Sequence, residues 1–215
     1  MRLTRRSILP ALTACVLMTS VSGCGTFLYF FWPFGRTVTI PAEYDGLANH
    51  TVAVVIYADE QTQYEYPWVM LNLSARISGR LQEKLENVTT VDARKITAYQ
   101  RQNLHWTAMD KTELGKALKA DFVLHVSLVE FSTAAKGFGE TLHGTINGEV
   151  KLYDCSEPEI DSLVWTTQNI EIEFPKTPTI RTAKKEAEIR SIIQAMFADK
   201  LAKKFYSYKV DREDL

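Results

Sequence analysis

The segment Thr51-Val52-Ala53-Val54-Val55-Ile56-Tyr57 decides the fold class of this chain. Its side chains are apolar almost without interruption, and most of them are branched at Cβ. Apolar and polar residues do not alternate, so neither face of the segment is suited to water. Such runs are typical of strands buried on both faces, as in parallel sheets. We therefore predict a buried strand over residues 51–57.

A long helix and a short strand are predicted after this segment. Pro67 favours the first turn of a helix. Apolar side chains then recur every four residues, at Val69, Leu73, Ile77, Leu81 and Leu85, with Met70 and Leu71 widening the stripe. Residues 88–91 predict the next strand. The order strand, helix, strand indicates a right-handed parallel crossover.

Further short elements are predicted on either side of this unit. Residues 37–40 indicate an extended piece, followed by a turn-rich stretch over residues 41–49. Residues 94–119 indicate two helical pieces, the second starting near Lys111 with Asp110 as its N-cap. The chain therefore returns to the sheet through helices.

The second half of the chain predicts an antiparallel meander and a final helix. The strands cover residues 122–131, 141–153 and 163–174, with turns over residues 136–140 and 156–161. The final helix, residues 182–205, places on one face Ile189, Ile192, Ile193, Met196, Phe197, Leu201 and Phe205.

Together these elements predict one α/β (α+β) domain over residues 37–215. Its mixed sheet has five or six strands, with a parallel N-terminal part and an antiparallel C-terminal meander. About four helices pack on this sheet. A chain of this length buries enough surface to be stable without a metal or a disulfide.

The first 23 residues have the layout of a secretory signal. They carry Arg2, Arg5 and Arg6 and no acidic residue, followed by an apolar stretch from Ile8 to Met18. That stretch is too short to span a bilayer. The alternatives are an uncleaved membrane anchor and a secreted protein with a chance cysteine.

The sequence Val21-Ser22-Gly23-Cys24 resembles the lipobox of bacterial lipoproteins. The resemblance implies that residues 1–23 are a lipoprotein signal peptide and that Cys24 becomes the lipidated first residue, bearing fatty acids such as palmitate. Two acyl chains hold a protein stably on a membrane. Gly25 stands where, in similar enterobacterial lipoproteins, an aspartate would signal inner-membrane retention. We therefore expect a lipid-anchored protein on the periplasmic face, with the outer membrane favoured over the inner membrane.

Residues 24–36 predict an aromatic tether after the lipidated cysteine. The run Phe27-Leu28-Tyr29-Phe30-Phe31-Trp32 is followed by Pro33 and Phe34. Aromatic rings favour the headgroup region of membranes. The segment is therefore predicted either to contact the membrane interface or to pack on the domain.

Charge, composition and motifs exclude several classes of function. The chain has 25 Lys and Arg against 26 Asp and Glu, so its charge does not indicate nucleic acid as a partner. Serine-hydrolase, P-loop, zinc-protease and Cys-x-x-Cys motifs are absent from the sequence. We therefore expect no catalytic residue, no metal and no cofactor.

Two alternatives to a non-enzymatic protein remain at this point. His125 and His143 fall on consecutive predicted strands and are candidates for cross-strand neighbours, which with Glu149 would form the site of a ligand-binding carrier or hydrolase. Cys155 is the only thiol left after cleavage and lipidation, and it is either a nucleophile or a small residue at a strand end. Its neighbours Asp154 and Glu157 would raise its pKa, which favours the structural alternative.

Three passages resemble a group of bacterial envelope lipoproteins. They are residues 120–126, residues 144–154 and Leu163-Val164-Trp165. The group comprises the curli-secretion lipoprotein, the lipoprotein activator of penicillin-binding proteins and the N-terminal domain of the Tol system's periplasmic protein. In this group Asp121 would cap the turn between helix and sheet, and Trp165 would pack its ring against the sheet or a helix.

This resemblance covers about residues 50–205 and implies a role in the envelope. The expected partners are the membrane, through the lipid anchor, and proteins of the cell-wall or outer-membrane machinery. The chain lacks the long amphipathic hairpins of the curli pore protein, so a secretion pore is not expected. The sequence predicts no oligomeric state.

Overall fold

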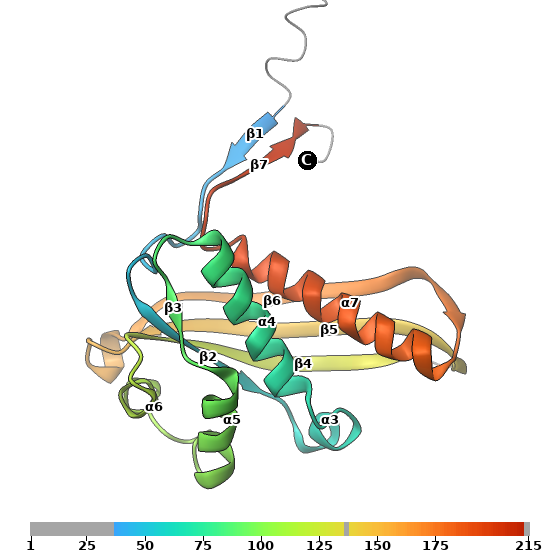
Figure 1. The fold of residues 1–215 in the computed structure, drawn as a ribbon, viewed down its shortest axis with the longest axis horizontal. Helices are drawn as coiled ribbons and strands as arrows, with labels where there is room; N and C mark the ends of the chain where they lie inside the picture. Colours follow the sequence, from blue (N-terminus) through green and yellow to red (C-terminus); the bar gives the residue numbers. More distant parts are fainter. Residues whose placement is uncertain (1–36, 136–137, 213–215) are drawn as a thin grey trace, which may run out of the picture. The chain divides into compact units, whose positions relative to one another are not determined.

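The structure, a computed structural model, describes residues 37–135 and 138–212 (Figure 1). These residues fall into two units, which are described separately. One unit includes residues 37–40 and 209–212, where β1 (Thr37–Ile40) forms a two-stranded sheet with β7 (Tyr208–Asp211). The other unit, residues 41–208, holds the five-stranded sheet and the helices.

The five-stranded sheet has the order β3-β2-β4-β5-β6. Its strands are β2 (Thr51–Tyr57), β3 (Thr89–Thr90), β4 (Phe122–Ala135), β5 (Phe138–Asp154) and β6 (Leu163–Ile180). β2 pairs in parallel with β3 and β4, whereas β4, β5 and β6 form an antiparallel meander. The predicted mixed sheet, with its parallel N-terminal part and its C-terminal meander, is therefore confirmed.

Five α-helices and one short 3-10 helix are present in the described part of the chain. They are α3 (Glu60–Glu65), α4 (Val69–Lys84), α5 (Ala93–Gln102), α6 (Lys111–Leu118), η1 (Glu159–Asp161) and α7 (Ala183–Ala202). Asp59, Asp92, Asp110 and Thr182 cap the N-termini of α3, α5, α6 and α7 through their side chains. Asp110 was predicted in this role, and the prediction is confirmed. Among the described residues, no helix is long and apolar enough to cross a membrane.

The side chains of β2 alternate between two hydrophobic cores. Val52, Val54 and Ile56 enter the core formed with α4 and α7. Ala53 and Val55 enter a smaller core on the other face, with α5, α6 and Trp106. All five side chains are at most 1% exposed. The uninterrupted apolar run is therefore explained by helices on both faces, as predicted for residues 51–57.

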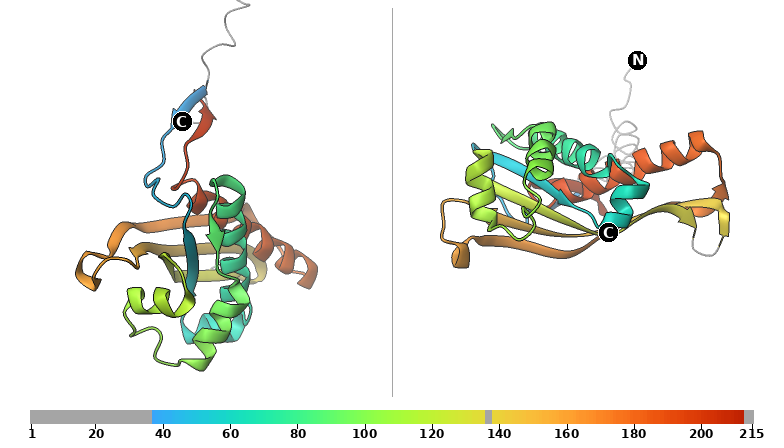
Figure 2. Two further views of the ribbon diagram at one scale, coloured as in Figure 1. Left: turned by 60° about the vertical axis from the view of Figure 1, so that its left-hand side comes forward. Right: turned by 90° about the horizontal axis from the view of Figure 1, so that it is seen from below.

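α4 and α7 run side by side on one face of the sheet, where α4 packs on β2 and α7 packs on β5 and β6 (Figures 1 and 2). The predicted stripe of α4 is confirmed, with Val69, Leu73, Ile77 and Leu81 buried. The predicted face of α7 is partly wrong, because Ile192 is half-buried and Met196 is 39% exposed. Gln194 and Ala198 are buried instead. Packing against α4 therefore turns the buried stripe of α7 toward that helix.

Several element boundaries differ from the prediction. α3 was not predicted, because none of its six residues is buried and the segment carries no apolar pattern. β5 begins at Phe138, inside the turn expected over residues 136–140, and β4 extends to Ala135. β6 extends to Ile180 through two prolines, which an edge strand tolerates because their missing N–H groups need no partner.

The two architectural roles expected from the resemblance are present. The Asp121 carboxylate accepts a hydrogen bond from the Thr51 backbone N–H at 2.7 Å, which ties the turn after α6 to the start of β2. The Trp165 ring meets the Phe205 ring edge-on, with centroids 4.9 Å apart. Both residues therefore stabilise the fold.

Candidate functional site

A groove of about 570 Å³ lies at the carboxyl end of β2. Its lining comes from α3, the start of α4, the end of α5 and the following loop, and comprises Tyr57, Ala58, Glu60, Gln63, Pro67, Met70, Leu71, Thr97, Gln100, Arg101, Leu104, Trp106 and Thr107. β3 and β4 flank β2 in the sheet. The chain reaches β3 through α4 on one face of the sheet, and it reaches β4 through α5 and α6 on the other face. In open α/β sheets, the carboxyl end of such a strand is the usual position of a binding site. We name this cavity the β2 groove.

The wall of the β2 groove combines a buried aromatic base with an exposed apolar rim. Trp106 is only 8% exposed, and its ring centroid lies 6.2 Å from that of Tyr57. Tyr57 is 38% exposed and Leu104 is 83% exposed. Large apolar side chains in water next to a concave surface are typical of interaction sites. The rim is therefore available to an apolar group of a partner.

Two glutamines supply polar contacts in the β2 groove. The Gln100 Nε2 donates to the Ile56 carbonyl at 3.0 Å, and the Gln63 Nε2 donates to the Ala58 carbonyl at 2.7 Å. These bonds satisfy carbonyls at the end of β2 and fix both side chains. The Oε1 atoms accept no hydrogen bond from another described residue in the structure, so each can accept an N–H from a ligand.

The loop after α5 is held in place by its own hydrogen bonds. The Lys111 ammonium donates to the carbonyls of Thr107 and Met109 at 3.0 and 2.8 Å. The Asn103 side chain donates to the Tyr99 carbonyl at 2.9 Å. Burial lowers the pKa of Lys111 from its ordinary value, while Asp110 opposes this effect. This wall of the β2 groove is therefore formed before any ligand binds.

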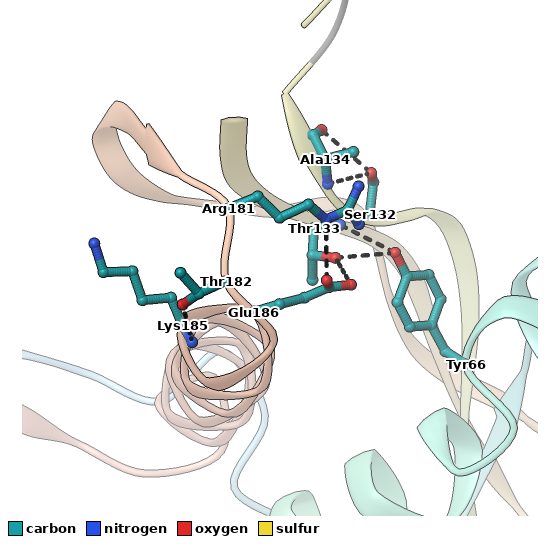
Figure 3. Close-up of polar contacts among 8 residues, drawn as sticks. All are labelled: Tyr66, Ser132, Thr133, Ala134, Arg181, Thr182, Lys185 and Glu186. Atoms are coloured by element: carbon teal, nitrogen blue, oxygen red, sulfur yellow. Dashed lines mark hydrogen bonds and ion pairs between the residues drawn. The ribbon is translucent and has the colours of Figure 1, made fainter. Parts of the chain in front are cut away.

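The opposite wall is fixed by a polar network that joins α3, β4 and α7 (Figure 3). The Thr133 backbone N–H donates to the Tyr66 hydroxyl at 3.2 Å, and the Tyr66 and Thr133 hydroxyls are 3.1 Å apart. The Thr133 hydroxyl donates to Glu186 at 2.9 Å. The Arg181 Nε donates to the other oxygen of Glu186 at 3.1 Å. These four residues are named the Tyr66 network.

The Tyr66 network is well suited to hold the junction between α3 and α4. Thr133 is fully buried and Tyr66 is 7% exposed. Hydrogen bonds from Arg181 and Thr133 lower the pKa of Glu186, against the effect of its partial burial. Glu186 is therefore ionised at neutral pH, and its bonds to Arg181 and Thr133 are charge-assisted. Pro67 follows Tyr66 directly and lines the β2 groove.

The expected neighbourhood of His125 and His143 is wrong. His125 lies opposite Lys151 in the register of β4 and β5, eight residues along β5 from His143. That separation is about 27 Å at the rise of a strand. Glu149 lies opposite Ser127. The strands pair in a different register from the one that a shared site would need, so these three residues do not form a site.

Each histidine instead has local partners, and the Ser127 hydroxyl lies 3.5 Å from the His125 Nδ1. The His143 Nδ1 donates to the Pro175 carbonyl at 2.9 Å, and its Nε2 lies 3.7 Å from Glu173. Burial, together with the charges of Lys111 and Lys151, lowers the pKa of His125 to about 4. Among the described residues, no group of three or more His, Cys, Asp or Glu side chains is arranged to hold a metal ion.

Cys155 packs as a small buried residue. It is 5% exposed, and a Cβ added to Gly115 would overlap its sulfur atom. Burial and the nearby Asp154 carboxylate raise the pKa of the thiol to about 11. A thiol with so high a pKa carries almost no thiolate at neutral pH. The environment therefore fits the structural alternative for Cys155.

Sequence reasoning missed a cavity of about 350 Å³ beside Cys155, which His50 and Asp121 also line. The His50 Nδ1 lies 3.7 Å from the Asp121 carboxylate. The three residues are far apart in the sequence, and no motif connects them. The raised thiol pKa removes the nucleophile that a Cys-His-Asp arrangement would need.

The predicted lipidation site and membrane contact lie outside the described residues. They are Cys24 and the run Phe27, Leu28, Tyr29, Phe30, Phe31 and Trp32. Both therefore stay predictions from the sequence.

No protein-family model and no curated protein matches this chain. Among solved structures, it is similar to the PelC dodecamer from Paraburkholderia phytofirmans, with 12% identity and a TM-score of 0.45 over 80% of this chain and 99% of that chain. Lipoprotein GNA1162 from Neisseria meningitidis has 14% identity and a TM-score of 0.42, over 69% and 98%. TolB from Acinetobacter baumannii has 14% identity and a TM-score of 0.30, over 79% and 30%.

Bacterial lipoproteins are thus among the solved structures that are similar to this chain. All three TM-scores lie below 0.5 and all three identities are 14% or less. The similarities therefore assign neither a family nor a function, and membership of the groups named from the sequence stays a prediction.

Proposed function

We propose that this chain is a lipid-anchored, non-enzymatic protein of the bacterial envelope that binds a segment of a partner protein in the β2 groove. The observation that carries the proposal is the lining of this groove. A buried Trp106 and an exposed apolar rim stand beside two fixed glutamine amides. An extended peptide offers backbone amide groups along its whole length and apolar side chains at some positions, so this lining suits such a peptide.

The charge of the β2 groove also favours a peptide. One acidic residue, Glu60, and one basic residue, Arg101, contribute to the lining. Binding of a phosphate-rich ligand needs an excess of basic groups. A balanced lining favours a partner segment with little net charge.

Absence of catalysis is part of the proposal. The lining of the β2 groove includes no histidine, lysine or cysteine. The lining has hydroxyl groups, on Thr97, Thr107 and Tyr57. It has no histidine or lysine, the bases that usually activate a hydroxyl group as a nucleophile. Binding is the activity that this arrangement supports best.

Anchoring is supported by the first 24 residues of the sequence. The arginine-rich start, the short apolar stretch and the lipobox-like Val21-Ser22-Gly23-Cys24 favour cleavage before Cys24 and attachment of fatty acids there. We place the domain on the periplasmic side, at the outer membrane rather than the inner membrane. The partners would then belong to the cell-wall or outer-membrane machinery.

Site-specific photo-crosslinking in intact cells tests the proposal. A photoreactive amino acid is placed at Leu104, on the rim of the β2 groove, and in a matched control at Ile160, which is 93% exposed and is not among the lining residues. We expect one envelope protein to be crosslinked through a defined segment from Leu104 and not from Ile160. Identical products from both positions, or none from Leu104, would contradict the proposal.

A further inference from the structure

A second, smaller cavity of about 150 Å³ lies beside the Tyr66 network. It is lined by Tyr66, Pro67, Trp68, Val69, Asn72, Arg190 and Gln194, from the start of α4 and the middle of α7. Typical sites for drug-sized ligands have volumes of about 300–1,000 Å³. This cavity, which we name the Gln194 pocket, therefore admits only a small chemical group or the end of a chain.

Gln194, which lines this pocket, carries a buried hydrogen-bond donor without a partner among the described residues. The residue is 2% exposed, and its Nε2 has no hydrogen-bond partner among the described residues. A buried donor without a partner destabilises the folded state. Such groups in native structures therefore indicate an acceptor that is supplied from outside the chain.

Arg190 adds a positive charge next to this donor. Glu186, Arg190 and Gln194 follow one another at intervals of four residues and lie along one side of α7. The Arg190 guanidinium lies 5.8 Å from the centroid of the Tyr66 ring. Glu186 already accepts from Arg181 and Thr133. The N–H groups at the edge of Arg190 can therefore bind another acceptor.

The donors in the Gln194 pocket define the chemistry of its ligand. A guanidinium and an amide N–H together suit a carboxylate, which accepts hydrogen bonds at both oxygens and carries the opposite charge. Trp68 is 58% exposed and offers an apolar surface beside the same pocket. A carboxylate that is attached to a short apolar group fits both features.

Pro67 connects the Gln194 pocket to the β2 groove, since it lines both cavities. A peptide in the β2 groove can therefore place its end in the Gln194 pocket by passing this one residue. The geometry points to recognition of the C-terminal tail of the partner, with its terminal carboxylate bound by Arg190 and Gln194. This inference rests on the proposed function and specifies which segment of the partner is bound.

A pair of matched peptides tests this inference. Acetyl-Leu-Leu-Ala is prepared with a free carboxylate and with a C-terminal amide, and acetate serves as the minimal probe. Binding to the ¹⁵N-labelled full chain in detergent micelles is followed by NMR. The Gln194 side-chain amide and the Trp68 indole report on the Gln194 pocket, and the Trp106 indole reports on the β2 groove.

We expect saturable shifts of the Gln194 and Trp68 signals with the free acid, and binding of the amide that is about tenfold or more weaker. Gln194→Met and Arg190→Met, which keep much of the side-chain volume, should remove the preference for the acid. Arg94→Met is the control, because Arg94 lies on α5 and pairs with Asp92.

The outcomes separate this inference from the proposed function. Equal binding of acid and amide, with shifts at Trp106, would support the β2 groove and overturn carboxylate recognition. Acetate shifts at Gln194 without any peptide shift at Trp106 would support a carboxylate site but contradict a peptide tail that spans both cavities. No shift of Gln194 with any probe would show that the pocket holds only water and would overturn the inference.

Discussion

Replacing Thr133 with valine isolates the contribution of the Tyr66 network. Valine keeps the shape of threonine and replaces only the hydroxyl group, with a methyl group. In the protein this hydroxyl donates to Glu186 at 2.9 Å, so the Tyr66 hydroxyl, 3.1 Å away, donates its proton to the Thr133 oxygen. Valine therefore removes the acceptor of a buried tyrosine hydroxyl and one donor to a carboxylate.

The magnitude follows from these two losses. A buried donor left without a partner costs about 1–3 kcal/mol, and a hydrogen bond to a charged group contributes about 1.5–3 kcal/mol. The Glu186 side chain is 23% exposed, so water replaces part of the second loss. We expect Thr133→Val to lower the free energy of unfolding by about 2–4 kcal/mol.

Urea unfolding followed by circular dichroism measures this change. Thr133→Ser is the control, because it keeps the hydroxyl and removes one methyl group, which costs about 1 kcal/mol. Tyr66→Phe combined with Thr133→Val completes a double-mutant cycle, in which we expect a coupling of at least about 1 kcal/mol. A Thr133→Val protein within about 0.5 kcal/mol of the wild type would show that these two hydrogen bonds do not stabilise the fold.

Three further predictions concern titration, packing and anchoring. His125 has a pKa of about 4 in the folded protein, below its unfolded value of about 6.5. Between these two pH values the unfolded chain binds more protons than the folded protein. The free energy of unfolding therefore falls as the pH is lowered through this window. The loss of free energy of unfolding is at most about 3 kcal/mol. Urea unfolding at pH 7 and pH 4.5 should show a smaller loss in His125→Gln than in the wild type. Gly115→Ala should lower the free energy of unfolding by about 1–3 kcal/mol because the added Cβ overlaps the Cys155 sulfur. Gly115→Ala combined with Cys155→Ala should recover part of this loss. Equal stability of Gly115→Ala and the wild type would contradict this packing. Cys24→Ala should move the protein from the membrane fraction to the soluble fraction and remove the lipid mass in mass spectrometry, and unchanged fractionation would contradict lipidation.

The sheet and most helices could be predicted because their signals are local. Residues 51–57 are apolar without alternation, and this pattern follows directly from cores on both faces of β2. The stripe of α4 is equally local, since its buried residues Val69, Leu73, Ile77 and Leu81 recur every four residues in the sequence. α7 packs on both the sheet and α4, so the burial of Gln194 and the exposure of Met196 depend on a tertiary neighbour that the sequence pattern does not reveal.

The candidate sites could not be predicted because their residues are distant in sequence. Tyr66 and Thr133 are 67 positions apart, and Thr133 and Glu186 are 53 positions apart. The expected pairing of His125 and His143 failed because His125 lies opposite Lys151 in the register of β4 and β5, and a strand's sequence does not reveal its register with a neighbour. α3, which forms one wall of the β2 groove, has no buried residue and hence no hydrophobic pattern.

The affinity of the β2 groove for the crosslinked partner segment is the decisive measurement of peptide binding by this protein. The segment identified from Leu104 is synthesised, and its dissociation constant is measured by isothermal titration calorimetry with the wild type, Leu104→Ser and Ile160→Ser. Truncating a residue that anchors an interface costs about 2 kcal/mol or more, which weakens binding more than tenfold. We predict this loss for Leu104→Ser and wild-type affinity for Ile160→Ser. Equal affinities of all three proteins would show that the partner does not bind in the β2 groove.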